Sequence, residues 1–181
     1  MMRVISGEWR GRKLLAPRND ATRPTADRTR ETLFSMLTSR VGSFEGLVVA
    51  DLFAGSGALG IEALSRGAEQ CLFAEQDRDA LDVLRKNLGT LDATARADIR
   101  AGSVLALGPA RRTYDLILID APYDTGAGSV ALDKLNRLGW IGPDSLISIE
   151  TGEKEEVELA GFEIDATRKV GKAKLTLLRP V

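Results

Sequence analysis

The amino-acid sequence predicts an α/β protein whose sheet is mostly parallel, with helices on both faces. Strand-like and helix-like segments alternate from Leu47 onward. A glycine-rich stretch, "FAGSGALG", follows the first of these strands, and a strongly apolar run, "YDLILIDAPY", ends in a carboxylate, a proline and an aromatic ring. Ligands of such sheets bind at the carboxyl ends of the strands, so both stretches are expected at one edge of the sheet.

Each element follows from the spacing of apolar residues and from the residues that begin or end helices. Apolar runs predict strands at 47–53, 70–77, 95–102, 114–120 and 145–152, and helical spacing predicts helices at 59–68, 77–91 and 131–141. Asp77 or Asp79 is suited to begin the second helix, and Gly89 lies near its end. The last two apolar segments, 161–170 and 173–180, predict a closing antiparallel pair.

The first 40 residues do not follow this alternation. Two short strands around "GEWRG" predict a hairpin, and residues 25–40 predict a helix with a partly apolar stripe. This segment has nine Lys and Arg against four acidic side chains, whereas the remainder has 16 against 22. We therefore expect a basic N-terminal extension over 1–40 and a larger domain over 41–181. An anionic partner and a solvated basic surface both explain the charge.

Composition excludes several kinds of chemistry. The chain has no histidine and one cysteine, Cys71, so an internal disulfide and a Ser-His-Asp site are ruled out and no metal site is expected. Cys71 lies in a predicted strand and is interpreted as part of the core. No apolar stretch approaches the roughly 18 residues of a membrane span. The first residues lack the apolar core of a signal peptide, which predicts a cytoplasmic protein without a membrane partner.

The glycine stretch predicts a site for an adenosine-containing cofactor. Asp51 ends a strand, Gly55, Gly57 and Gly60 have dinucleotide spacing, and Glu75 lies about 20 residues further on, where a carboxylate can bind ribose hydroxyls. NAD and S-adenosylmethionine both fit this pattern. A carboxylate at position 51 repels a pyrophosphate and attracts an ammonium or sulfonium, which favours S-adenosylmethionine.

The candidate cofactor-binding residues come from the ends of three successive predicted strands. They are Asp51, Phe53, Ala54, Gly55, Ser56, Gly57, Glu75, Gln76, Ser103 and Val104. Ser103 and Val104 are expected near the adenine, although a plain strand-to-helix turn explains them equally well.

"DAPY", residues 120–123, resembles the (Asp/Asn)-Pro-Pro-aromatic motif of methyltransferases that modify exocyclic amines. The nitrogen lone pair of such an amine is delocalised into the ring, so it needs hydrogen-bond acceptors that hold its hydrogens. The Asp120 carboxylate and the Ala121 carbonyl are such acceptors. Pro122 restricts Ala121 to an extended conformation, and Tyr123 can stack on the base. Ala121 departs from the proline usual at that position.

Five segments in this order resemble the bacterial methyltransferase family that modifies N2 of guanine 966 in 16S ribosomal RNA. They are "GEWRGRKL", "RPTADRTRETLFSML", "DLFAGSGALGIEALSRGA", "EQDR" and "DAPY". The resemblance covers roughly Arg3 to Tyr123 and weakens afterwards. It implies a Rossmann-like class I methyltransferase fold, with a mostly parallel seven-stranded sheet and an antiparallel terminal strand.

The resemblance also implies a substrate, 16S ribosomal RNA within the small ribosomal subunit or an assembly intermediate, and a role for the basic extension. RNA is expected to contact Arg10, Arg12, Lys13, Arg23 and Arg28. Trp9 can stack on a base, but packing of the hairpin is the preferred interpretation. We expect a monomer. Two alternatives remain: an amine methyltransferase for DNA adenine N6 or protein glutamine, and a non-catalytic RNA-binding assembly module.

Overall fold

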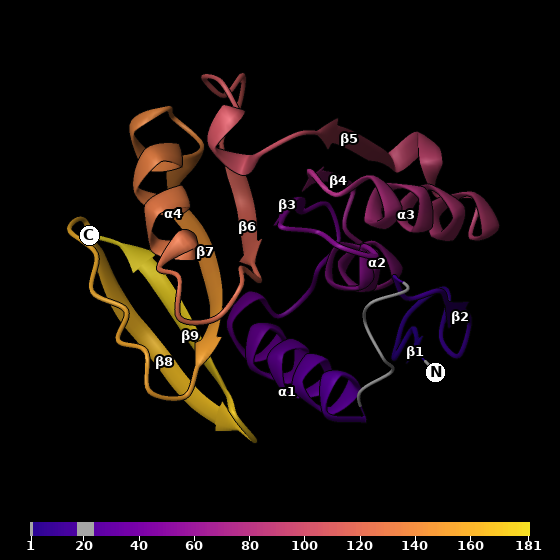
Figure 1. Cartoon of the computed structure of the whole chain (residues 1–181), viewed down its shortest axis with the longest axis horizontal. Helices are drawn as coiled ribbons and strands as arrows, with labels where there is room; N and C mark the ends of the chain where they lie inside the picture. Colours follow the sequence, from indigo (N-terminus) through magenta and orange to yellow (C-terminus); the bar gives the residue numbers. More distant parts are fainter. Residues whose placement is uncertain (1, 18–23) are drawn as a thin grey trace.

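The computed structural model describes residues 2–17 and 24–181 and has the predicted α/β architecture (Figure 1). Its elements in chain order are β1 (Met2–Arg3), β2 (Lys13–Leu14), α1 (Pro24–Val41), β3 (Val48–Leu52), α2 (Ala58–Ser65), β4 (Gln70–Glu75), α3 (Arg78–Thr90), the 3₁₀ turn η1 (Thr94–Arg96), β5 (Ala97–Ala101), the 3₁₀ turn η2 (Val104–Ala106), β6 (Tyr114–Ile119), α4 (Ala127–Arg137), β7 (Ile141–Gly152), β8 (Phe162–Val170) and β9 (Ala173–Pro180). Within the described ranges, no helix has the length and apolar character needed to cross a membrane.

The seven-stranded sheet has the order β5-β4-β3-β6-β7-β9-β8. The first five strands of this order run parallel, and β9 is antiparallel to both of its neighbours. The order reverses between β3 and β6, because the chain adds β4 and β5 on one side and β7 on the other. Open α/β sheets bind their ligands at the carboxyl edge beside such a reversal. The predicted sheet, including its antiparallel strand, is confirmed.

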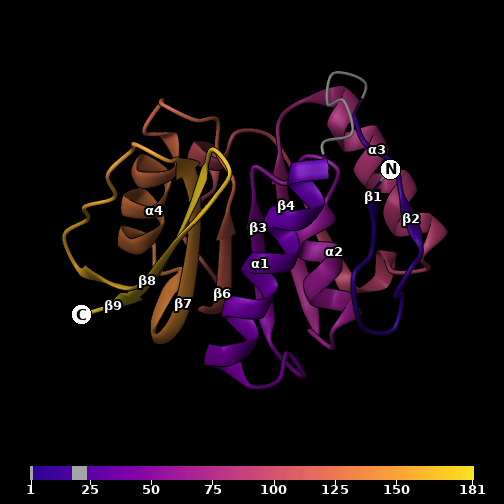
Figure 2. The ribbon, with the colours of Figure 1, turned by 90° about the horizontal axis from the view of Figure 1, so that it is seen from below.

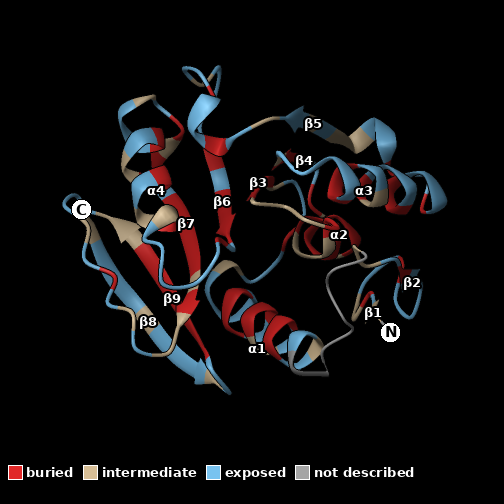
Figure 3. Ribbon diagram, viewed as in Figure 1, coloured by how far each residue is buried: buried red, intermediate tan, exposed pale blue. Residues whose placement is uncertain are grey.

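Apolar side chains cover both faces of the sheet. On one face, Phe34 and Leu37 of α1 pack with Leu64 of α2 and Leu84 of α3, and Figure 2 shows α1 and α2 lying across these strands. On the other face, η2 and α4 contribute most of the covering side chains. Figure 3 shows that the central strands are buried, whereas β8 is largely exposed. Cys71 is fully buried in the core, as predicted.

The N-terminal hairpin is fastened to α2 and α3 through buried polar side chains. The Glu62 carboxylate accepts hydrogen bonds from the backbone N–H groups of Ile5 and Ser6 at 2.9 and 3.0 Å. The Asn87 amide accepts from Leu15 N–H at 2.8 Å and donates to Leu15 C=O at 3.0 Å. These contacts hold the hairpin beside α2 and α3 (Figures 1 and 2).

The extension expected over residues 1–40 shares its apolar core with the rest of the chain. Val4, Trp9 and Leu14 lie in the same cluster of buried side chains as Phe34 and the strand residue Val49. The division into an extension and a domain over 41–181 stays a prediction, and in this structure the two pack on one core.

The predicted boundaries of one helix and of the start of the strand after it, expected at residue 145, are wrong. The helix expected over 131–141 begins earlier, at Ala127, and ends at Arg137, while Ile141 already belongs to β7. Gly139 has a φ of +83°, and the N–H of Trp140 donates to the Leu135 carbonyl at 3.1 Å. This is a Schellman motif, which ends a helix at a glycine in the left-handed conformation.

Candidate active site

The glycine loop turns sharply between β3 and α2. Phe53, Gly55 and Gly57 have φ values of +61°, +58° and +85°. Such a φ is costly for a bulky residue, and strained residues of this kind gather at ligand sites. A Cβ at Gly57 would lie 2.3 Å from the Leu84 side chain, so position 57 requires glycine. Phe53, Ala54 and Gly55 remain partly accessible, whereas Ser56 and Gly57 are buried.

Asp51 lies beneath this loop, where 1% of its surface is exposed. Its Oδ2 accepts a hydrogen bond from the Gly60 backbone N–H at 2.9 Å. Burial raises the pKa of Asp51 to about 8, although the Gly60 N–H opposes the shift; the Glu75 charge adds to it. The structure therefore puts Asp51 under the loop rather than on its accessible surface, and its raised pKa favours the protonated, uncharged form of the carboxyl.

Glu75 is the last residue of β4, and its carboxylate links the glycine loop to the start of α3. Its two carboxylate oxygens accept hydrogen bonds from the N–H groups of Gly55 and Asp77, both at 2.8 Å. A carboxylate has lone pairs beyond these two, so the half-buried Glu75 can still accept from a diol. Gln76 follows it and is exposed.

Ser103 and Val104 lie after β5, the next strand along the same edge. The Gly102 N–H donates to the Glu75 carbonyl at 2.9 Å, which ties the two strand ends together. Ser103 is exposed and its hydroxyl accepts from the Leu105 N–H at 3.2 Å, as a cap of η2. Val104 is 4% exposed and packs in the core, so Ser103 is the more accessible of the pair.

The "DAPY" segment begins where β6 ends, directly beside the glycine loop. The Asp120 N–H donates to the Leu52 carbonyl at 3.4 Å, so the end of β6 meets the end of β3. Asp120, Pro122 and Tyr123 are exposed, whereas Ala121 is buried. The two motifs that the sequence predicts to share an edge are therefore adjacent at the point where the strand order reverses.

Two acidic residues that the sequence interpretation did not single out hold this segment. The Tyr123 hydroxyl donates to Glu150 Oε2, at the carboxyl end of β7. The Glu155 carboxylate accepts from the Gly152 N–H at 3.0 Å and from the Asp124 N–H. Glu150 follows the apolar part of β7, as Asp120 follows β6, and that shared pattern was the signal available in the sequence.

Four of the five predicted RNA-binding residues are exposed in the structure. Arg10, Arg12, Lys13 and Arg28 are exposed, whereas Arg23 lies outside the described residues. Arg12 also donates to the Thr90 carbonyl at the end of α3 at 3.0 Å.

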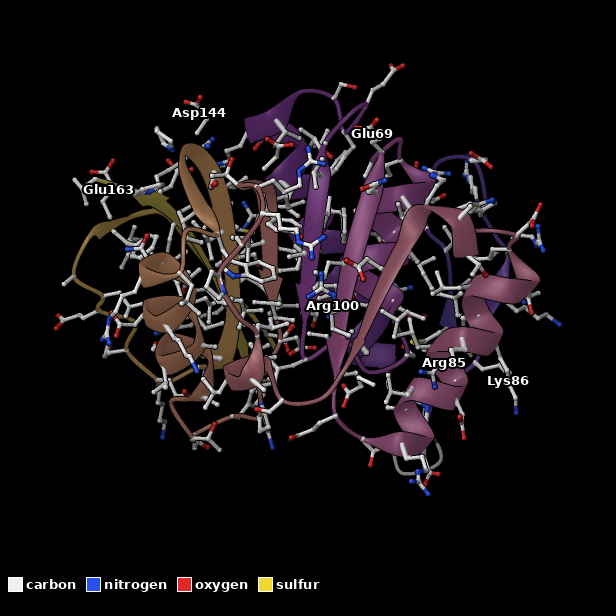
Figure 4. All side chains as sticks on the ribbon, turned by 90° about the horizontal axis from the view of Figure 1, so that it is seen from above. Glu69, Arg85, Lys86, Arg100, Asp144 and Glu163 are labelled. Carbon is white, nitrogen blue, oxygen red and sulfur yellow. The ribbon has the colours of Figure 1, made fainter. Side chains whose placement is uncertain are left out.

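Further exposed cations lie on the neighbouring helix. Arg85 and Lys86 project outward from α3 (Figure 4), and the hairpin lies against the same helix.

Trp9 is 6% exposed, and the Arg96 guanidinium lies 5.3 Å from the centre of its ring. The interpretation that Trp9 packs the hairpin onto the body is confirmed, since a side chain buried to this extent has little face left for a base.

The strand order, the glycine loop and the amine motif at the end of β6 define a class I methyltransferase fold. Comparison with known proteins agrees with this class. The chain belongs to the family described as "Conserved hypothetical protein 95", whose sequence model matches residues 2–179. The family resemblance predicted from the sequence is confirmed.

Curated relatives and a solved structure extend this result. The chain is 38% identical to the Ribosomal RNA small subunit methyltransferase D of Escherichia coli K12 over 150 residues, which are 83% of this chain and 74% of that protein. It is 38% identical to the protein of the same name from Haemophilus influenzae over 159 residues, covering 86% and 80%. The solved structure of the Escherichia coli methyltransferase candidate yhhF superposes with a TM-score of 0.86 at 34% identity, covering 99% and 97%.

Proposed function

We propose that this protein transfers a methyl group from S-adenosylmethionine to the exocyclic N2 amine of a guanine in 16S ribosomal RNA, the nucleotide at position 966 in the family. The observation that carries the proposal is the contact between the ends of β3 and β6, which joins the glycine loop to the "DAPY" segment. The names of the curated relatives support ribosomal RNA of the small subunit as the substrate.

The residues around the glycine loop fit S-adenosylmethionine. Glu75 accepts hydrogen bonds from the ribose hydroxyls, and the backbone from Phe53 to Gly57 passes close to the ligand because glycines at 55 and 57 present no Cβ. The buried Asp51 carboxylate is stabilised when a cation binds above it. Gln76, Ser103 and Val104 border the adenosine. S-adenosylmethionine itself supplies an electrophilic methyl group on a sulfonium.

The chemistry at the amine requires orientation rather than a strong base. The Asp120 carboxylate and the Ala121 carbonyl accept the amine hydrogens, which directs the nitrogen lone pair at the methyl group. Pro122 limits the conformations of the residue before it, and the Tyr123 ring stacks on the base. This arrangement uses no histidine, in agreement with the composition.

The basic extension docks the RNA. Arg10, Arg12, Lys13, Arg23 and Arg28 contact phosphates of the RNA, and Arg85 and Lys86 of α3 add further exposed cations. The substrate is presented within the small ribosomal subunit or an assembly intermediate, in the cytoplasm, and the enzyme acts as a monomer.

The proposal is tested by methyl transfer from labelled S-adenosylmethionine. Small subunits from cells that lack the gene, duplex DNA and bulk protein are offered to the wild type and to Asp120→Ala. We expect transfer to the subunits only, and loss of transfer in Asp120→Ala, because the amine loses an acceptor while the cofactor site is unchanged. Asp144→Ala, at the amino-terminal end of β7 (Figure 4), is the matched control.

Calorimetry with S-adenosylmethionine completes the test. Binding heat in both Asp120→Ala and Asp144→Ala is the expected result. Full turnover by Asp120→Ala would refute the assignment of Asp120. Absence of binding heat in the wild type would instead favour the non-catalytic RNA-binding module.

A further inference from the structure

We infer that Glu150 reads the N1–H of the target guanine and so makes the site specific for guanine among bases with an exocyclic amine. The inference rests on the proposed function, because it concerns the same amine site. The "DAPY" motif alone fits adenine and guanine alike, and Glu150 is the residue that separates them.

Glu150 lies beside Asp120 at the edge where the chemistry is proposed. Strands β6 and β7 are parallel, with Ile119 paired to Ile149. Asp120 and Glu150 are the next residues of these neighbouring strands, so the two carboxylates share one face of the sheet at its carboxyl edge. Glu150 is partly exposed there.

Glu150 is hydrogen-bonded to Tyr123, whose ring is proposed to stack on the base. The Tyr123 hydroxyl donates a hydrogen bond to Glu150 Oε2, so the carboxylate lies at the rim of the ring on which the base stacks. A base that stacks on the Tyr123 face presents its hydrogen-bonding edge near both carboxylates. Stacking and edge recognition then come from one connected pair of side chains.

Glu155 makes this arrangement rigid. Its carboxylate accepts from the Gly152 N–H, at the end of β7, and from the Asp124 N–H, directly after the motif. The loop that carries Tyr123 is thereby fastened to the strand that carries Glu150. A preorganised set of acceptors discriminates between ligands better than a mobile one, since the ordering cost is already met.

The donor pattern of guanine matches this set of acceptors. Its Watson–Crick edge has three adjacent donor hydrogens, two on N2 and one on N1, whereas adenine has an acceptor at N1 beside its amine. Asp120 and the Ala121 carbonyl accept the N2 hydrogens, and Glu150 accepts N1–H. The lone pairs of a carboxylate allow this bond in addition to the one from Tyr123. The N1 lone pair of adenine would face a negative charge instead.

The test uses 2-aminopurine, which keeps the 2-amine but has an acceptor at N1. Reconstituted small subunits carry guanine or 2-aminopurine at the target position, and kcat/KM for methyl transfer is measured for each. In Glu150→Gln the amide can donate to the N1 of 2-aminopurine and can still accept from guanine. We expect the guanine to 2-aminopurine ratio of kcat/KM to fall by about 10- to 100-fold relative to the wild type.

Two further variants distinguish an effect of the Glu150 carboxylate from an effect of the Tyr123 ring or of misfolding. Tyr123→Phe removes the hydrogen bond to Glu150 but leaves the carboxylate, so its ratio should stay near that of the wild type. Glu150→Asp withdraws the carboxylate by one methylene and should lower the ratio even if Glu150→Gln folds poorly. Glu158→Gln, exposed beyond β7, is the matched control.

The outcomes separate this inference from the proposed function. An unchanged ratio in Glu150→Gln and Glu150→Asp, with guanine still methylated, overturns the inference alone. An equal fall of the ratio in Tyr123→Phe also overturns it, because Glu150 would then act only through the ring. No transfer to guanine by the wild type would overturn the proposed function itself.

Discussion

Between pH 5.5 and 7.5, the free energy of unfolding of the wild type should decline as the pH rises. In Asp51→Asn it should be nearly independent of pH over the same range. Burial raises the pKa of Asp51 from 3.8 to about 8 in the folded protein. The folded state therefore binds more protons than the unfolded state between these values. The stabilisation that protonated Asp51 contributes is fully present below pH 3.8 and is lost as the pH rises toward 8. Where the slope is steepest, the free energy of unfolding falls by about 1.4 kcal/mol per pH unit.

The magnitude follows from this single proton. Between pH 5.5 and 7.5 the wild type should lose about 2–3 kcal/mol of unfolding free energy. The chain has no histidine, so few other side chains titrate in this interval. Asn keeps an oxygen for the Gly60 N–H but carries no charge, so the variant should be the more stable protein at pH 7.5 and should bind S-adenosylmethionine more weakly.

The assay is urea unfolding of both proteins, and of Asp144→Asn as an exposed control, at pH 5.5, 6.5 and 7.5. The control should decline in parallel with the wild type. A wild-type free energy that is flat across this interval would refute the reasoning, as would an Asp51→Asn free energy that falls just as steeply.

Two further predictions concern the cofactor loop and the basic extension. A Cβ at Gly60 would lie 2.4 Å from Phe73 and 2.7 Å from the Cys71 sulfur, so Gly60→Ala should lower the free energy of unfolding by about 1–3 kcal/mol in urea unfolding, whereas Gly89→Ala, with open space around it, should not. Replacing the exposed hairpin cations at positions 10, 12 and 13 by Ala should weaken binding to 16S RNA fragments by about tenfold or more and reduce the salt dependence of log K by roughly 2, measured by filter binding. The same change at three exposed cations around the β8–β9 turn is the control, and an equal effect there would contradict a specific docking role; these residues are Arg168, Lys169 and Lys172.

The alternation of apolar segments was sufficient to predict the sheet, because its central parallel strands β3, β4 and β6 are buried along most of their length. The run from Tyr114 to Ile119 is the clearest case, and it forms β6 at the centre of the sheet. The end of α4 was misjudged because apolar residues continue past Arg137, although Gly139 marked the turn. Glycine in a left-handed conformation outweighs the periodicity that surrounds it.

Contacts between segments that are distant in the chain could not be predicted from the sequence. Nothing in the chain near Leu15 indicates that the Asn87 side chain binds its backbone and also donates to the Ser56 carbonyl at 3.0 Å. Glu150 was likewise visible only as an acid at the end of a strand. Its relation to Tyr123 depends on the parallel register of β6 and β7, which apolar patterns do not specify.

The most direct test of the central claim, that an amine held by Asp120 and Ala121 receives the methyl group, is mass-spectrometric mapping of the modified nucleotide. Small subunits from cells that lack the gene are incubated with S-adenosylmethionine and either the wild type or Asp120→Ala. A single N2-methylguanine at position 966, formed by the wild type and absent with the variant, is the predicted result. A methyl group on another nucleotide, or equal modification by the variant, would contradict the account.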